Sequence, residues 1–130
     1  MSGSREVRIL VADNDARVRS ALQTLLKQEP GLVIGECSDL ESLVVQIKEF
    51  KPDLVLLDWE LRGRPATALL FAAHAADYRP KTIVLSGRPE SEQAALDAGA
   101  DAFVSKADPP ERLLDTLRKL VSESGKWMPS

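Results

Sequence analysis

The stretch Pro52-Asp53-Leu54-Val55-Leu56-Leu57-Asp58 decides the fold class, because four consecutive apolar residues run directly into a carboxylate. A short continuous apolar run is typical of a parallel strand that is buried on both faces. A second run, Ile9-Leu10-Val11-Ala12, ends in the same way at Asp13. Both runs therefore bring a carboxylate to the same edge of a predicted sheet.

Short apolar runs alternate with longer stretches at helical spacing along the rest of the chain. This alternation predicts parallel strands that are connected by crossover helices. The predicted strands are Val7 to Ala12, Leu32 to Cys37, Leu54 to Asp58, Thr82 to Ser86 and Ala102 to Ser105. Right-handed crossovers then favour one doubly wound α/β sheet with helices on both faces.

Five helices are expected, and capping acids, glycines and prolines predict where they begin and end. The first helix is expected between Asp15 and Gly31, and the second between Asp39 and Pro52. The third is expected over Ala66 to Tyr78 and the fourth from Ser91 to Gly99. The fifth is expected to begin at Pro109-Pro110. The chain thus divides into an N-terminal extension (1–6), one domain (7–121), and a tail or the start of a linker (122–130).

Composition excludes several classes of protein. A chain of 130 residues with 44% hydrophobic content fits one domain, and its net charge of −3 provides no basic field for direct nucleic-acid binding. The single Cys37 cannot form an internal disulfide. Neither a membrane-spanning apolar stretch nor a signal-peptide pattern is found, so we expect a cytoplasmic protein without a membrane partner.

Polar residues stand at the carboxyl ends of four of the predicted strands, namely Asp13, Asn14, Asp58, Ser86 and Lys106. Ligands of doubly wound sheets bind beyond these carboxyl ends of the strands, so the five side chains are expected to share one crevice. Crowded carboxylates raise each other's pKa, and a divalent cation relieves their repulsion. Mg²⁺ takes oxygen ligands, while a hydroxyl and an ammonium group can bind the oxygens of a phosphoryl group. The sequence therefore predicts a Mg²⁺-dependent phosphoryl site.

From about Val7 to Leu120 the chain resembles the receiver domains of bacterial response regulators. The matching motifs are Ala12-Asp13-Asn14, Pro52 to Asp58, Ser86-Gly87, and Gly99 to Lys106. Each motif alone is a weak signal, but their joint order and spacing are specific. The resemblance implies a flavodoxin-like strand order of 2-1-3-4-5 with five helices. It also implies a two-component signalling switch that receives its phosphoryl group from a sensor histidine kinase or a phosphotransfer protein.

The resemblance also assigns the acceptor and the metal site. Asp58 is the expected phosphoacceptor. The expected Mg²⁺ ligands are Asp13, Asn14, Asp58 and the backbone carbonyl of Glu60. Receivers normally carry Asp or Glu where this chain has Asn14. The lost charge is expected to weaken Mg²⁺ binding, and it leaves open an alternative, a degenerate receiver that acts as a phosphorylation-independent interaction module.

The remaining expected site residues respond to the phosphoryl group. Ser86 is the switch hydroxyl, Lys106 pairs with Asp58 or its phosphate, and Phe103 is the ring that changes rotamer. Together they are expected to alter the face formed by the fourth helix, fifth strand and fifth helix. Glu60 and Arg88 flank the site, and we expect an ion pair between them that slows attack of water on the acyl phosphate.

One enzyme class competes with this interpretation, because Asp13-Asn14-Asp15 also resembles the opening motif of haloacid-dehalogenase-type phosphatases. We discount it, since a downstream acidic motif is missing and Asp58 would have no function. The chain is thus expected to be no enzyme beyond its own phosphorylation and dephosphorylation. Gly125 to Pro129 resembles the lead-in to a helix-turn-helix domain, so we expect a transcription regulator whose DNA-binding output domain lies outside this chain. Homodimer formation stays open.

Overall fold

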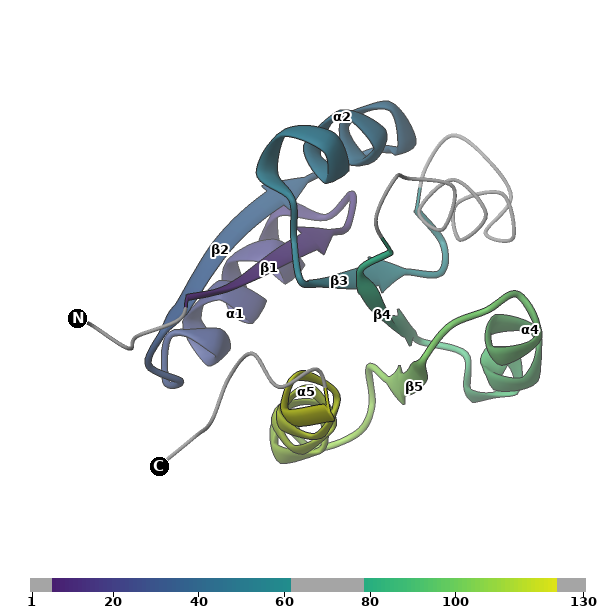
Figure 1. Cartoon of the computed structure of the whole chain (residues 1–130). Coiled ribbons are helices and arrows are strands. Elements are labelled where there is room, and N and C mark those ends of the chain that lie inside the picture. The colour runs from purple at the N-terminus through teal and green to yellow at the C-terminus, as the bar shows by residue number, and fades with distance from the viewer. Residues whose placement is uncertain (1–5, 62–78, 124–130) are drawn as a thin grey trace.

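A five-stranded parallel sheet forms the centre of the protein, with strand order β2-β1-β3-β4-β5 (Figure 1). The structure is a computed structural model and describes residues 6–61 and 79–123. The strands are β1 (Val7–Ala12), β2 (Leu32–Cys37), β3 (Leu54–Asp58), β4 (Lys81–Ser86) and β5 (Ala102–Ser105). The prediction of a doubly wound α/β sheet with order 2-1-3-4-5 is confirmed.

Helices cover both faces of the sheet, with α1 and α5 on one face and α2 on the other (Figure 1). The helices are α1 (Ala16–Leu26), α2 (Leu40–Phe50), α4 (Glu92–Asp97) and α5 (Pro110–Glu123), and a short 3₁₀ helix, η1 (Pro89–Ser91), leads into α4. The predicted helix from Ala66 to Tyr78 lies outside the described residues. The first two helices begin as predicted, because the carboxylate of Asp15 accepts from the Arg17 N–H and that of Asp39 from the Ser42 N–H.

Two apolar clusters, one on each face, explain why the strands read as continuous apolar runs. Ile9 and Val11 of β1 join the cluster under α1 and α5, whereas Leu10 and Ala12 join the cluster under α2. Successive side chains of a strand point to opposite faces, so burial of both faces requires apolar residues at every position. The apolar stripe of α5 is buried: it comprises Leu113, Leu114, Leu117, Leu120 and Val121.

Small departures from the predicted boundaries occur at turns. β4 begins at Lys81, one residue before the predicted start. Gly99 has φ of 112°, as expected for a left-handed position after a helix. Lys51, which follows α2, also adopts a left-handed conformation, with φ of 52°. This conformation was not predicted, because a non-glycine residue there carries no sequence signal.

The single cysteine belongs to the core. Cys37 ends β2 and is buried. Burial and the neighbouring charge of Asp39 raise the pKa of its thiol to about 12. The thiol therefore stays protonated at neutral pH, in agreement with a packing role. Among the described helices, none has the length and apolar composition needed to cross a bilayer.

Candidate functional site

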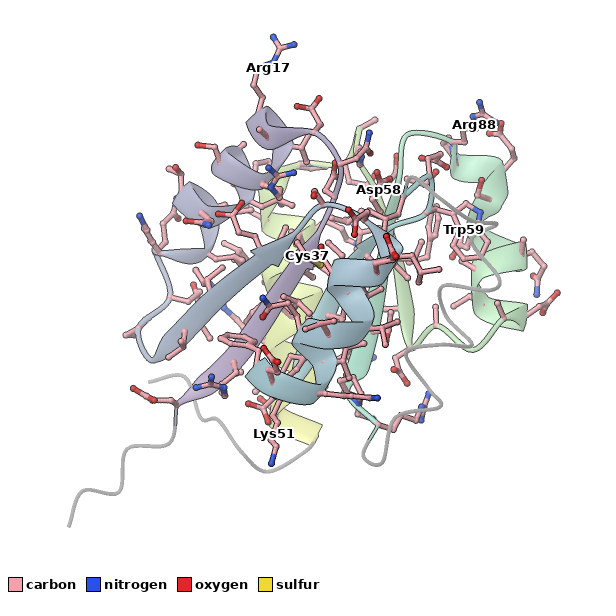
Figure 2. The ribbon with its side chains drawn as sticks, turned by 90° about the horizontal axis from the view of Figure 1, so that it is seen from above. Arg17, Cys37, Lys51, Asp58, Trp59 and Arg88 are labelled. Atoms are coloured by element: carbon pink, nitrogen blue, oxygen red, sulfur yellow. The ribbon has the colours of Figure 1, made fainter. Side chains whose placement is uncertain are left out.

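Strand register places two acids side by side at one edge of the sheet. Ala12 of β1 pairs with Leu57 of β3, so the residues that follow, Asp13 and Asp58, leave neighbouring strands at the same level. The loop after β1 leads directly into α1, whereas β3 ends at Asp58 itself. Figure 2 views the sheet from the side of α2 and shows Asp58 between the start of α1 and the loop that carries Arg88.

Lys106 connects the two acids. It directly follows β5, and its Nζ atom lies 3.1 Å from Oδ2 of Asp13 and 3.3 Å from Oδ1 of Asp58. Both acids are buried, with exposed fractions of 2% for Asp13 and 3% for Asp58. One ammonium group, on a side chain that is 32% exposed, thus faces two buried carboxylates. Asp13, Asp58 and Lys106 converge as the sequence predicted.

The electrostatics of the site follow from this excess of negative charge. Burial raises the pKa of Asp58, and the neighbouring charge of Asp13 raises it further. The Glu60 N–H and Lys106 act in the opposite direction without cancelling the increase. For Lys106, burial disfavours the charged form, but the attraction of Asp58 and Asp13 outweighs burial and raises its pKa. An additional cation would stabilise this pair of carboxylates.

Backbone groups fix the orientation of both carboxylates. The N–H of Asp15 donates to Oδ1 of Asp13 at 2.9 Å, and the N–H of Glu60 donates to Oδ1 of Asp58 at 3.1 Å. Each acid therefore accepts from the backbone two residues further along the chain. Asn14, between Asp13 and Asp15, is exposed at the same edge. The side chain of Asp15 caps α1, which matches the structural role predicted for it.

Arg19 also supports the site, and sequence reasoning missed it. Its Nη1 atom donates to the backbone carbonyl of Asp13 at 2.6 Å, and its Nε atom donates to Oε1 of Glu36 at 2.7 Å. The arginine thereby ties α1 and β2 to the loop that carries the first acid. Its position four residues after the helix-capping Asp15 was the available signal, since residues at this spacing share one face of a helix.

The hydroxyl of Ser86 contacts the Glu60 carboxylate, a partner that the sequence did not predict. The hydroxyl donates to Oε2 of Glu60 at 3.0 Å and accepts from the backbone N–H of Arg88 at 3.0 Å. The expected ion pair between Glu60 and Arg88 is wrong: within the described ranges the two side chains form no such pair, and Figure 2 shows Arg88 extending outward from its loop. An exposed arginine loses little by staying in water, whereas the buried hydroxyl needs an acceptor.

Phe103 lies on the inner side of β5. Its side chain is 8% exposed and belongs to the cluster that also contains Val84 of β4 and Ala95 of α4. The strand is joined to the site through the backbone, because the N–H of Lys106 donates to the carbonyl of Ser86 at 2.8 Å. The ring, the hydroxyl and the lysine therefore belong to neighbouring strands of one sheet.

The donor atoms at this edge fit Mg²⁺ in type. Mg²⁺ prefers hard oxygen donors. Donors of this kind at this edge are the carboxylates of Asp13 and Asp58, the amide oxygen of Asn14 and the backbone carbonyl of Glu60. The part of the chain that the structure describes holds no group of three or more acidic, histidine or cysteine side chains arranged for a metal ion. Asn14 offers a neutral amide oxygen at this edge, where the two buried carboxylates are Asp13 and Asp58.

Comparison with known proteins assigns the family. The family model for the response regulator receiver domain matches residues 9–118, which includes both acids and Lys106. The chain is a response regulator receiver domain. The family interpretation made from the motifs is thereby confirmed.

Curated relatives and a solved structure agree with this assignment. The receiver domain is 33% identical over 105 residues to a protein-glutamate methylesterase/protein-glutamine glutaminase of Methanospirillum hungatei, covering 77% of this chain and 31% of the relative. It is 30% identical over 120 residues to the phosphate regulon transcriptional regulatory protein PhoB of Escherichia coli, covering 88% and 51%. A CheY-like receiver domain structure from Methanospirillum hungatei superposes with a TM-score of 0.82 at 27% identity, covering 93% and 98%.

The receiver domain spans about half or less of the length of these two curated relatives. The methylesterase, glutaminase and transcription functions are named for those whole proteins. What the chain shares with them is the response regulator receiver domain.

Proposed function

We propose that this receiver domain accepts a phosphoryl group on Asp58 in a Mg²⁺-dependent reaction and thereby controls a downstream partner. The observation that carries the proposal is the contact of one ammonium group, that of Lys106, with two buried carboxylates, Asp13 and Asp58. If Lys106 served only to stabilise the fold through an ion pair, one carboxylate beside it would be sufficient. The second acid leaves the site with excess negative charge, which suits a cation that binds phosphate.

The transfer chemistry follows from the positions of the side chains. An oxygen of Asp58 attacks the phosphorus of a phosphohistidine, the P–N bond breaks, and its electron pair stays on the imidazole nitrogen. Lys106 then binds a phosphoryl oxygen in place of the Asp58 carboxylate, and Ser86 donates its hydroxyl proton to another. Asp13, Asp58, Asn14 and the Glu60 carbonyl would hold Mg²⁺, which would supply positive charge for the phosphoryl oxygens.

The output is a change in the face formed by α4, β5 and α5. Movement of Ser86 toward the phosphoryl group alters the backbone bond from Lys106 to the Ser86 carbonyl and the space beside Phe103. A shift between two existing conformations of this face then changes its affinity for a partner. The Escherichia coli relative is named as a transcriptional regulatory protein, and we propose that this receiver domain likewise controls transcription. On the sequence pattern alone, we further propose a DNA-binding output domain in the full-length protein and a cytoplasmic location.

Intact mass spectrometry after incubation with acetyl phosphate tests the proposal. We expect the mass of one phosphoryl group to be added in the presence of Mg²⁺, and no addition to the Asp58→Asn variant or after chelation of Mg²⁺. Asp97→Asn, which changes an exposed acid on α4, is the matched control and retains the addition. No addition to the wild-type chain, either with acetyl phosphate or with a histidine-phosphorylated donor, would identify a phosphorylation-independent module instead.

A further inference from the structure

The hydroxyl of Ser86 uses its single proton in a bond to a side chain. Oγ donates to Oε2 of Glu60 at 3.0 Å and accepts from the N–H of Arg88 at 3.0 Å. Ser86 is fully buried, with no exposed surface. A serine hydroxyl has one donor proton, so Ser86 cannot donate to a phosphoryl oxygen while it donates to Glu60.

We propose that the Glu60 side chain is a positioning residue that restrains Ser86 in the unphosphorylated state and sets how readily the switch responds. The proposal rests on the proposed phosphorylation of Asp58 and adds a role for the carboxylate of Glu60, separate from its backbone carbonyl. The bond replaces the Glu60 to Arg88 ion pair expected from the sequence. It links the loop after β3 to the end of β4.

Glu60 is coupled to both ends of the switch. Its N–H donates to Oδ1 of Asp58 at 3.1 Å, and its carboxylate accepts from Ser86. A phosphoryl group on Asp58 carries about two negative charges, where the free carboxylate carries one, and brings them closer to the Glu60 carboxylate. Like charges then repel the Glu60 side chain, and the phosphoryl oxygens offer Ser86 a competing acceptor. Phosphorylation thus weakens the bond between Ser86 and Glu60 and at the same time provides phosphoryl oxygens that Ser86 can bind instead.

The strength of the Ser86–Glu60 hydrogen bond sets the equilibrium between the restrained and the released forms of Ser86. A phosphoryl group shifts the equilibrium only by the difference in its interaction with the restrained and released forms of Ser86. A hydrogen bond to a charged acceptor is stronger than one to a neutral acceptor. Removal of the Glu60 carboxylate therefore favours the released form and makes the domain respond at a lower concentration of phosphodonor.

The first experiment measures the contact without any phosphodonor. A double-mutant cycle of Glu60→Ala and Ser86→Ala in urea unfolding is expected to give a favourable coupling between the two side chains. Additive effects of the two substitutions would overturn the proposal at its first step.

The second experiment measures the response. Beryllofluoride, a stable mimic of the phosphoryl group, is titrated at saturating Mg²⁺ while the amide signal of Ser86 or its replacement is followed by NMR. We expect Glu60→Ala to lower the half-saturating concentration by about fivefold to tenfold. Glu60→Gln, whose amide oxygen still accepts from Ser86 without a charge, is expected to give an intermediate decrease.

Two controls separate restraint of Ser86 from a simple change of charge. In a Ser86→Ala background, Glu60→Ala is expected to have no effect on the half-saturating concentration. Glu90→Ala removes an acid from η1 and is expected to leave the wild-type response unchanged. The proposal would be overturned if Glu60→Ala lowered the half-saturating concentration equally with and without the Ser86 hydroxyl. It would also be overturned if Glu90→Ala lowered that concentration as much as Glu60→Ala does. Wild-type protein that binds no beryllofluoride would instead refute the proposed function itself, and the restraint with it.

Discussion

The ammonium group of Lys106 lies 3.3 Å from Oδ1 of Asp58, although 48 positions separate these residues in the sequence. The contact exists because β3 and β5 end at the same edge of the sheet, with β4 between them. The same ammonium group also serves Asp13. Most of what we predict for this receiver domain follows from two buried acids that share one cation.

Replacing Asp58 by Asn is expected to stabilise the protein near neutral pH. Because burial and Asp13 raise the pKa of Asp58 in the folded state, the stability associated with its protonated form is present below the ordinary carboxyl pKa and is lost as pH rises through the folded pKa. Asn cannot ionise and avoids this loss. Urea unfolding near neutral pH should show a larger free energy of unfolding for Asp58→Asn, and the difference should disappear at about pH 4 or below.

The exposed Asp97→Asn is the matched control for that comparison, since it removes the same charge outside the site. Its stability relative to wild type should lack this dependence on pH. A destabilised Asp58→Asn variant at neutral pH would contradict the charge balance that we describe.

Restoring an acid at position 14 is expected to tighten Mg²⁺ binding. Asn14→Asp adds a negative charge beside Asp13 and Asp58, and affinity for such cations rises with the number of charged ligands. We predict an increase of about tenfold in Mg²⁺ affinity, measured by isothermal titration calorimetry. Asp58→Asn should weaken binding in the same assay. If Asn14→Asp bound Mg²⁺ no better than wild type, position 14 would not belong to the metal site.

A steric prediction concerns the contact between β2 and α2. A Cβ atom on Gly35 would lie 3.2 Å from Cζ of the Phe50 ring, and the guanidinium of Arg8 holds that ring with its carbon 4.2 Å from the ring centroid. Gly35→Ala is therefore expected to lower the free energy of unfolding by about 1 to 3 kcal/mol, because the ring cannot move away freely. Gly87→Ala, which has no neighbour within 4 Å, serves as the control.

The Gly87→Ala control should stay within about 0.5 kcal/mol of wild type in urea unfolding. Equal stability of Gly35→Ala and Gly87→Ala would show that the Phe50 ring can move aside without cost.

The left-handed residue after α2 predicts a stabilising substitution. Lys51 has φ of 52°, where a Cβ atom costs about 1 kcal/mol or more and glycine adopts the conformation freely. Lys51→Gly is expected to raise the free energy of unfolding by about 1 kcal/mol, as measured by urea unfolding. Lys51→Ala keeps the Cβ atom and should give no such gain. A stabilisation of equal size in both variants would point to the lysine charge instead.

The sequence was sufficient for the fold and for the meeting of the charged residues. Continuous apolar runs predicted β1 and β3, and the acids that follow these runs had to meet because parallel strands end at one edge. Lys106 could be added from its place after the last strand. These predictions depend on backbone topology, which the periodicity of apolar residues in the sequence indicates.

The partners of individual side chains could not be predicted in the same way. Opposite charge suggested an ion pair between Glu60 and Arg88, but the structure pairs Glu60 with the hydroxyl of Ser86. Which partner Glu60 contacts depends on the burial of the Ser86 hydroxyl and on the paths of two loops. Neither can be predicted from a single sequence. The support that Arg19 gives to the Asp13 carbonyl depends likewise on how α1 lies over the loop.

Location of the phosphoryl group is the most direct test of the central proposal. The chain is phosphorylated with acetyl phosphate and Mg²⁺, reduced with borohydride, which converts an aspartyl phosphate to homoserine, and mapped by peptide mass spectrometry. We predict homoserine at position 58 in the wild-type chain and at no position in the Asp58→Asn variant. Homoserine at position 13, or a phosphoryl group on a side chain other than Asp58, would contradict this account.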